Sequence, residues 1–140
     1  MPDTLIGESL HQLMHAYKRA LRQAYADAGL TLTVSHIRTL KAIRSLAPCT
    51  AQRIAQRTQR DKAQITRLLH DLLDAGIIAK RPHAEDRRSR ILALTAHGHG
   101  VMEQIDESER HAHQRLAAGL DAADLETFVR LSRLMVDNLH

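Results

Sequence analysis

Residues 50–95 read TAQRIAQRTQRDKAQITRLLHDLLDAGIIAKRPHAEDRRSRILALT, and this stretch decides the fold. It starts with a short helical segment at residues 50–58, turns at Gln59 and Arg60, and continues as a second helical segment at residues 61–76. Two short extended runs follow, residues 77–81 and 90–94, on either side of a charged connector. This order of helix, turn, helix and basic hairpin is typical of a winged helix-turn-helix, whose second helix enters a DNA major groove.

Positive charge is concentrated in the same stretch. Residues 50–95 contain 10 Lys and Arg against 5 Asp and Glu, a net charge of +5 (10 − 5). The other 94 residues contain 10 against 11, a net charge of −1, so the formal +4 of the chain arises entirely in this third. Such a distribution is typical of a phosphate-binding surface, and double-stranded DNA is therefore the predicted partner.

Composition limits the fold class and the setting. A chain of 140 residues fits one domain with a modest core, and with 2% aromatic residues that core must be largely aliphatic, which favours packed helices. We find no apolar run near the roughly 20 residues of a membrane span and no signal-peptide pattern. One Cys excludes an intrachain disulfide. We expect a soluble cytoplasmic protein without a cofactor.

Helical periodicity continues on both sides of the central stretch. Apolar spacing predicts helices over residues 4–28, ended by Gly29, and over residues 34–46, capped by Thr33. The outer face of the latter is expected to carry Arg38, Lys41 and Arg44. Thr95 and Asp121 are expected to cap two further helices. Residues 106–115 of the first of these are nearly all charged or His and are expected to be mostly wet.

Three of these helices carry apolar stripes that little of the neighbouring sequence can cover. We therefore expect a symmetric homodimer that holds two recognition helices about 34–36 Å apart on a palindromic site. The predicted fold is mainly α with a small β-hairpin wing. Its DNA-binding lobe spans residues 33–95, and its helical dimerisation region spans residues 4–28 and 96–140 of one compact domain.

The hairpin carries a resemblance to a known family. Asp86, Arg87 and Arg88, followed by ILALT at residues 91–95 and then Gly98, resemble the D-x-R…L-x-L-T-x-x-G signature of MarR-family transcriptional regulators. Residues 65–82, ITRLLHDLLDAGIIAKRP, resemble that family's recognition helix running into its wing. The order of six helices, with a hairpin between the fourth and fifth, extends the resemblance over essentially the whole chain.

This resemblance implies a homodimeric DNA-binding protein, usually a repressor, often released from its operator by a small amphipathic or phenolic ligand. It implies that Arg88 enters the minor groove, that Asp86 holds the wing by pairing with a nearby Arg, and that part of the recognition helix faces the major groove. The candidate DNA-binding residues are polar or basic: Lys62, Gln64, Thr66, Arg67, Arg87, Arg88 and Arg90. The alternatives are an ordinary polar helix face and a solvated hairpin tip.

The family also places small ligands between the dimer helices and the DNA-binding lobe. The residues best placed to line such a pocket are aromatic or polar: Tyr17, Tyr25, His36 and Arg38. The alternative is a Tyr pair packed in the core and a His on the surface, and the sequence leaves both possibilities open.

Cys49 and the ten His residues suggest other chemistry. A thiol beside a helix N-terminus can be redox-active, but Cys49 also suits a hydrophobic staple with Ile54, which we favour. His11 and His15 lie at a spacing that can chelate a metal, yet no compact ligand cluster surrounds them, and we predict no metal site.

Enzymes and interaction modules are the remaining function classes. The spacing of residues shows no Ser/His/Asp arrangement, phosphate-binding glycine loop or carboxylate pair, so we predict that the protein is not an enzyme. A helical protein-interaction module with a merely solubilising hairpin is the better alternative. The favoured hypothesis is a DNA-binding transcriptional regulator.

Overall fold

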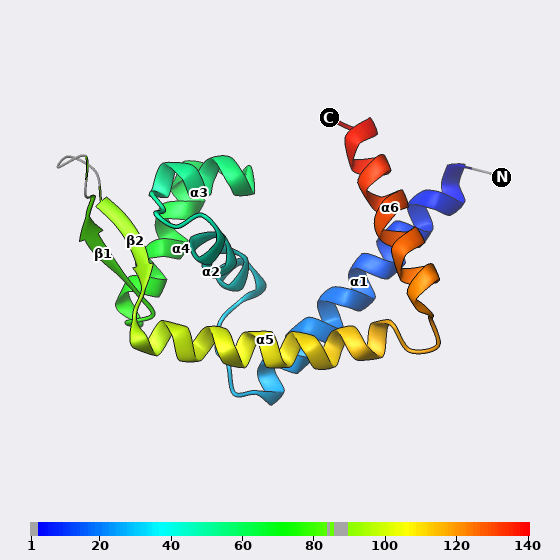
Figure 1. Ribbon diagram of the computed structural model, residues 1–140, viewed down its shortest axis with the longest axis horizontal. Coiled ribbons are helices and arrows are strands. Elements are labelled where there is room, and N and C mark those ends of the chain that lie inside the picture. The colour runs from blue at the N-terminus through cyan, green and yellow to red at the C-terminus, as the bar shows by residue number, and fades with distance from the viewer. Residues whose placement is uncertain (1–2, 84, 86–89) are drawn as a thin grey trace.

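The computed structural model describes residues 3–83, 85 and 90–140, so Asp86, Arg87 and Arg88 lie outside the described residues. The elements in chain order are α1 Asp3–Asp27, α2 Val34–Ser45, α3 Ala51–Thr58, α4 Lys62–Asp74, β1 Ile78–Pro82, β2 Arg90–Leu94, α5 Ala96–Leu116 and α6 Ala122–Asn138. Figure 1 shows α2, α3, α4 and the hairpin gathered at one end of α5, with α6 and the start of α1 at the other. The predicted class, mainly α with a small hairpin wing, is confirmed.

Short polar side chains begin the helices where the sequence predicts them. The hydroxyl of Thr33 accepts a hydrogen bond from the His36 backbone N–H at 3.1 Å, and Thr95 accepts one from Gly98 at 3.0 Å. The other N-caps that satisfy free backbone donors in this way are Thr50, Asp61 and Asp121. Gly29 and Gly76 end α1 and α4 at φ values of +76° and +71°, which glycine adopts without steric penalty.

One aliphatic core holds residues 33–95 together, and we call this part of the chain the lobe. Its fully buried side chains come from α2, α3, α4 and β1 and include Ile37, Leu40, Ile54, Ile65, Leu72 and Ile78. Each of these helices contributes the apolar stripe that its periodicity predicts. The polar face of each helix is thereby turned outward, which is how the hydrophobic pattern determines the surface presented to a partner.

The hairpin starts one residue later than the sequence predicts. Its antiparallel register runs from Ile78 opposite Leu94 to Pro82 opposite Arg90. Ile77 belongs instead to the turn after α4, because its N–H donates to the Leu72 carbonyl at 3.1 Å. A further bridge fixes the hairpin to the lobe, since the N–H of Leu92 donates to the Cys49 carbonyl at 2.7 Å.

The basic face of α2 is not simply turned to solvent. Lys41 is half-buried and forms an ion pair with Glu109 of α5, so the prediction that Lys41 lies on the outer face is wrong. Glu109 itself is buried within a segment that was expected to be mostly wet. Arg44 remains exposed but pairs with Asp106, which also lies on α5. Residues 60 or more positions apart thus neutralise each other, and local periodicity carries no information about such contacts.

Apolar surface is left uncovered at the other end of α5. None of the residues of α6 is buried within the single chain, and Phe128 and Leu134 are each 53% exposed. The first half of α1 exposes a second apolar set, Leu5, Ile6, Leu10, Leu13 and Met14. Contiguous apolar surface of this kind marks an interaction site. No helix in the described part of the chain is long and apolar enough to span a bilayer.

A close approach at Gly98 joins α5 to the turn that follows α4. A Cβ at this position would lie 2.0 Å from the carbonyl oxygen of Ile77, a backbone atom that cannot move away as a side chain can. Gly98 is therefore a packing requirement and not merely a weak helix former. Gly100 offers a contrast, because nothing lies within 4 Å of a Cβ added there.

We expect Gly98→Ala to lower the free energy of unfolding by about 1–3 kcal/mol, because the new methyl group must push α5 away from Ile77. Gly100→Ala is the matched control. It should raise stability by about 0.5–1 kcal/mol, since alanine is the better helix former and meets no obstacle. Urea denaturation followed by circular dichroism measures both, and equal effects of the two substitutions would contradict the close approach.

Candidate nucleic-acid interface

The outward face of α4 carries the residues expected to read DNA. Lys62, Gln64, Thr66 and Arg67 are all exposed, whereas Ile65 between them is 1% exposed. Asp61 caps the helix by accepting from the Ala63 N–H at 2.7 Å. The capped end and the buried stripe together hold these polar side chains on a rigid support, as groove recognition requires.

Thr66 differs from its neighbours on this face. Its hydroxyl donates to the Lys62 carbonyl of its own helix at 2.9 Å. The hydroxyl oxygen keeps its acceptor capacity and the methyl group remains, so Thr66 suits an acceptor contact or an apolar contact with a base. Long donors on this face are supplied instead by Lys62, Gln64 and Arg67.

The turn before α4 is built without glycine. Gln59 takes a left-handed conformation, φ +53°, at the end of α3. The half-buried Arg60 next to it donates from its guanidinium to the Ser35 hydroxyl of α2 at 3.1 Å. Arg53 donates to the Pro48 carbonyl at 3.1 Å. Two of the ten basic residues counted in this stretch therefore hold the lobe together, and a charge count alone overstates the phosphate-binding set.

The hairpin supplies further exposed basic side chains. Arg90, predicted to bind DNA, begins β2 opposite Pro82 and is exposed. Lys80 and Arg81 of β1 are also exposed, as is Arg57 of α3, and none of the three was among the predicted contacts. Their signal in the sequence was the net charge of the stretch, which does not distinguish one basic residue from another. The roles assigned to Asp86, Arg87 and Arg88 fall outside the described residues and stay predictions.

Three of the four residues named for an effector pocket share one environment. Tyr25 is 3% exposed and its hydroxyl donates to Glu109 Oε1 at 2.9 Å, while the Tyr17 hydroxyl lies 3.0 Å from His113 Nε2. Burial, with Glu109 adding to it, raises the pKa of both phenols, and the positive charge of Arg38 opposes this. Both phenols are therefore neutral at pH 7.

His36 lies apart from that group. Its Nδ1 accepts from the Thr33 backbone N–H at 3.1 Å, so its Nε2 is the ring nitrogen that faces Asp71 Oδ2 of α4, at 2.9 Å. The contact joins α2 to α4. A cavity under the connector between α1 and α2 is lined by Tyr25 together with Arg22 and Leu30, but not by His36.

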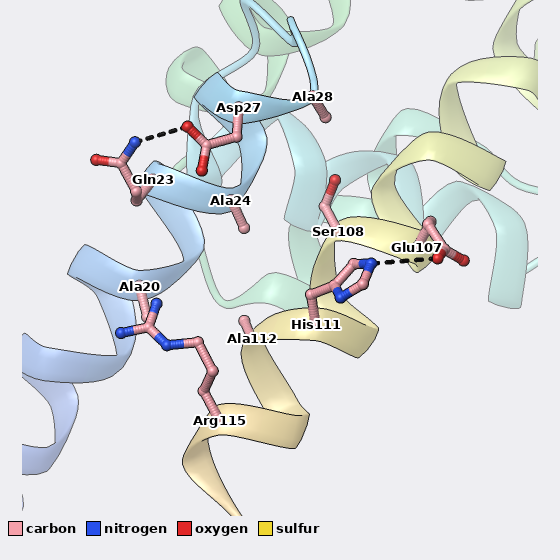
Figure 2. Close-up of a pocket in the computed structure, with 10 residues that line it drawn as sticks. All are labelled: Ala20, Gln23, Ala24, Asp27, Ala28, Glu107, Ser108, His111, Ala112 and Arg115. Carbon is pink, nitrogen blue, oxygen red and sulfur yellow. Dashed lines mark hydrogen bonds and ion pairs between the residues drawn. The ribbon is translucent and has the colours of Figure 1, made fainter.

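A second hollow lies between α1 and α5. Figure 2 shows the small side chains of Ala20, Ala24 and Ala112 facing each other across a cleft of about 320 Å³, with Arg115 and His111 at its edge. Parts of its rim are already paired, as Gln23 donates to Asp27 at 2.8 Å. The cleft exists because alanines at helical spacing leave a gap between two packed helices.

The surroundings of Cys49, and of His11 and His15, bear on the redox and metal hypotheses. Cys49 is 0% exposed, and burial raises its thiol pKa with only Arg53 opposing. Both properties favour the staple with Ile54 over a reactive thiol. His11 and His15 are exposed on α1, and within the described ranges no three His, Cys, Asp or Glu side chains come together to hold a metal.

Comparison with known proteins agrees with this arrangement. The model of the MarR family matches residues 28–89. Among solved structures, a mutant MarR from E. coli complexed with operator DNA is 24% identical, with a TM-score of 0.81, over 93% of this chain and 92% of that chain. A MarR/EmrR family regulator from Acinetobacter sp. ADP1 is 19% identical, with a TM-score of 0.81, over 98% and 96%.

Bordetella bronchiseptica BpsR, whose DNA binding is regulated by 6-hydroxynicotinic acid, is 23% identical, with a TM-score of 0.80, over 94% of this chain and 93% of that chain. These likenesses extend the shared fold beyond the lobe to both terminal helices. The central part of the chain, residues 28–89, is thus similar to the MarR family, and the whole chain shares the fold of these solved structures.

Proposed function

We propose that the protein is a sequence-specific repressor that binds a palindromic operator as a homodimer and is released by a small-molecule effector. The observation that carries the proposal is the exposed polar face of α4, with Gln64 and Arg67 held outward by a buried stripe, in the lobe that contains the net positive charge. Long polar donors on a rigid helix suit base edges, and the surrounding basic residues suit phosphates.

Two relatives in fold support DNA and a ligand as partners. E. coli MarR has been solved with operator DNA, and BpsR has DNA binding that a small aromatic acid regulates. For this protein we propose contacts from Lys62, Gln64, Thr66, Arg67 and the wing residues Arg87, Arg88 and Arg90, with Asp86 stabilising the wing. We place the effector near Tyr17, Tyr25 and Arg38, where two neutral phenols and a cation meet.

Uncovered apolar surface supports the homodimer. Apolar side chains of α6 and of the first half of α1 are exposed at the end of α5 opposite the hairpin. We propose that residues 4–28 and 96–140 bury them against a second copy, while residues 33–95 form the DNA-binding lobe. A two-fold axis then places two recognition helices on successive major grooves.

Selection of bound duplexes from random DNA, using the purified protein, tests this function directly. We expect a palindrome whose half-site centres lie about 10 base pairs apart, because a symmetric dimer places its two recognition helices in major grooves one helical turn apart. Affinity for the selected duplex should fall with salt at a log–log slope of about −0.9 per neutralised phosphate. A helical interaction module would select no sequence and would not bind duplex at physiological salt.

Arg67→Ala should weaken binding to the selected duplex by about 1–3 kcal/mol, because an exposed guanidinium on the recognition face is lost without disturbing the core. Arg130→Ala on α6 removes the same charge at the opposite end of α5 and serves as the control. Gel-shift titration at fixed salt compares the two. An equal loss for both variants would show that only net charge matters and would remove Arg67 from the interface.

Phe128→Glu should raise the dimer dissociation constant by on the order of 100-fold, because the partner copy would have to bury an unpaired carboxylate. The control is Gln56→Glu, which adds the same charge at an exposed position of α3 and should leave association unchanged. Sedimentation velocity over a range of concentrations measures both. A folded wild-type monomer at all concentrations would contradict the dimer.

A further inference from the structure

Two acidic residues of α5 face two basic residues of α2 at matching intervals. Arg44 donates through both terminal nitrogens to the Asp106 carboxylate, at 2.8 and 3.2 Å. One helical turn away, Lys41 pairs with Glu109. The two helices cross in opposite directions, so the residue numbers rise on one helix as they fall on the other. We call Lys41, Arg44, Asp106 and Glu109 the α2–α5 ladder.

The inner pair of the ladder joins the half-buried Lys41 to the buried Glu109 and connects three helices. Glu109 is 7% exposed, and while Lys41 pairs with one carboxylate oxygen, the Tyr25 hydroxyl of α1 donates to the other at 2.9 Å. A carboxylate is stable out of water only when such partners compensate its lost hydration. The outer pair of Arg44 and Asp106 is exposed, with side chains 43% and 42% accessible.

The ladder is a second polar contact between α5 and the lobe, away from the first turn of the helix. The first turn of α5 is fixed to the lobe at Thr95, whose hydroxyl donates to the Gly76 carbonyl at 2.6 Å, and at Gly98 against Ile77. The ladder contacts the lobe again some ten residues later, about 16 Å along the helix axis. Between these two points Met102 and Ile105 of α5 are buried in the same apolar core as α2 and α4, and the ladder adds directional polar contacts farther along the helix.

We propose that the α2–α5 ladder fixes the orientation of the DNA-binding lobe relative to α5 and thereby sets the separation of the two recognition helices in the dimer. Lys41, Arg44, Asp106 and Glu109 are then positioning residues, which act on DNA through the lobe without touching it. This inference rests on the proposed function. It adds that operator spacing is determined by side chains outside the DNA-contacting surface.

The outer pair provides the test, because its exposure allows charge reversal without burying an unpaired charge. Arg44→Glu and Asp106→Arg each place like charges opposite one another, and the double variant restores an ion pair with reversed polarity. The single variants change net charge by −2 and +2, so an effect of charge on DNA would have opposite signs in the two. Loss of the ladder would have the same sign in both.

Lobe separation is measured first without DNA. A spin label at Gln52→Cys, exposed on α3, reports the distance between the two lobes by double electron–electron resonance, and the native Cys49 is too buried to be labelled. We expect a narrow distribution in the otherwise unaltered protein, a broad one in each single variant and a narrow one in the double variant.

Operator spacing is measured second, on the selected palindrome and on versions with one base pair added or removed at its centre. We expect the preference for the correct spacing to fall roughly tenfold in both single variants and to return in the double variant. Affinities that shift in opposite directions with the spacing preference intact would overturn the proposal. So would single variants that broaden the distances with no recovery in the double variant.

The two proposals fail in distinguishable ways. Absence of duplex binding by the unaltered protein would overturn the proposed function and, with it, the link to operator spacing. The label distances would still show whether the ladder orients the lobe. Sequence-specific binding with distances and spacing preference unchanged in all variants would overturn the ladder alone.

Discussion

The close contact between α5 and the end of α4 is the constraint on which the arrangement depends. The first turn of α5 lies so near the Ile77 carbonyl that only a glycine fits at position 98. Thr95 reinforces this junction, because its hydroxyl accepts from Gly98 and also lies within hydrogen-bonding distance of the Gly76 and Ile77 carbonyls. The hairpin, α4 and α5 therefore meet at one junction, and α5 extends from it to the other end of the molecule.

The basic residues of the lobe divide into two groups with different physical roles. Lys41, Arg44, Arg53 and Arg60 are engaged with other parts of the chain. The exposed basic side chains of α4 and the hairpin include Lys62, Arg67, Lys80, Arg81 and Arg90. The first group holds the lobe in shape and orientation, and the second is available to phosphates and bases. Only the second group should set the salt dependence of DNA binding.

The ion pairs along α5 also connect the lobe with the surroundings of Tyr17 and Tyr25. Glu109 accepts a hydrogen bond from Tyr25 and pairs with Lys41. Burial raises the pKa of both phenols, and Glu109 raises it further. A molecule bound near these phenols would therefore be next to the side chains that orient the lobe. In the proposed function, this adjacency offers a physical route from an effector to the spacing of the recognition helices, because both would act on the same buried carboxylate.

Local sequence was sufficient for the elements and for the orientation of each helix. Apolar spacing and cap residues such as Thr33, Thr95 and Gly76 act within a few positions of the chain, so they predicted the helices, the hairpin to within one residue and the exposed face of α4. The winged helix-turn-helix follows from these local rules together with the family resemblance.

Contacts between distant segments were decided only by the tertiary structure. Nothing in the spacing of α2 reveals that Lys41 meets Glu109, that Arg60 meets Ser35, or that Gly98 lies against Ile77. Burial of a charge depends on which helix arrives from elsewhere in the chain, and a helical wheel assigns every charged residue to solvent. The sequence alone thus determined which face of α4 is exposed, while the contacts of α5 with α2 decided how Lys41 and Arg44 are engaged.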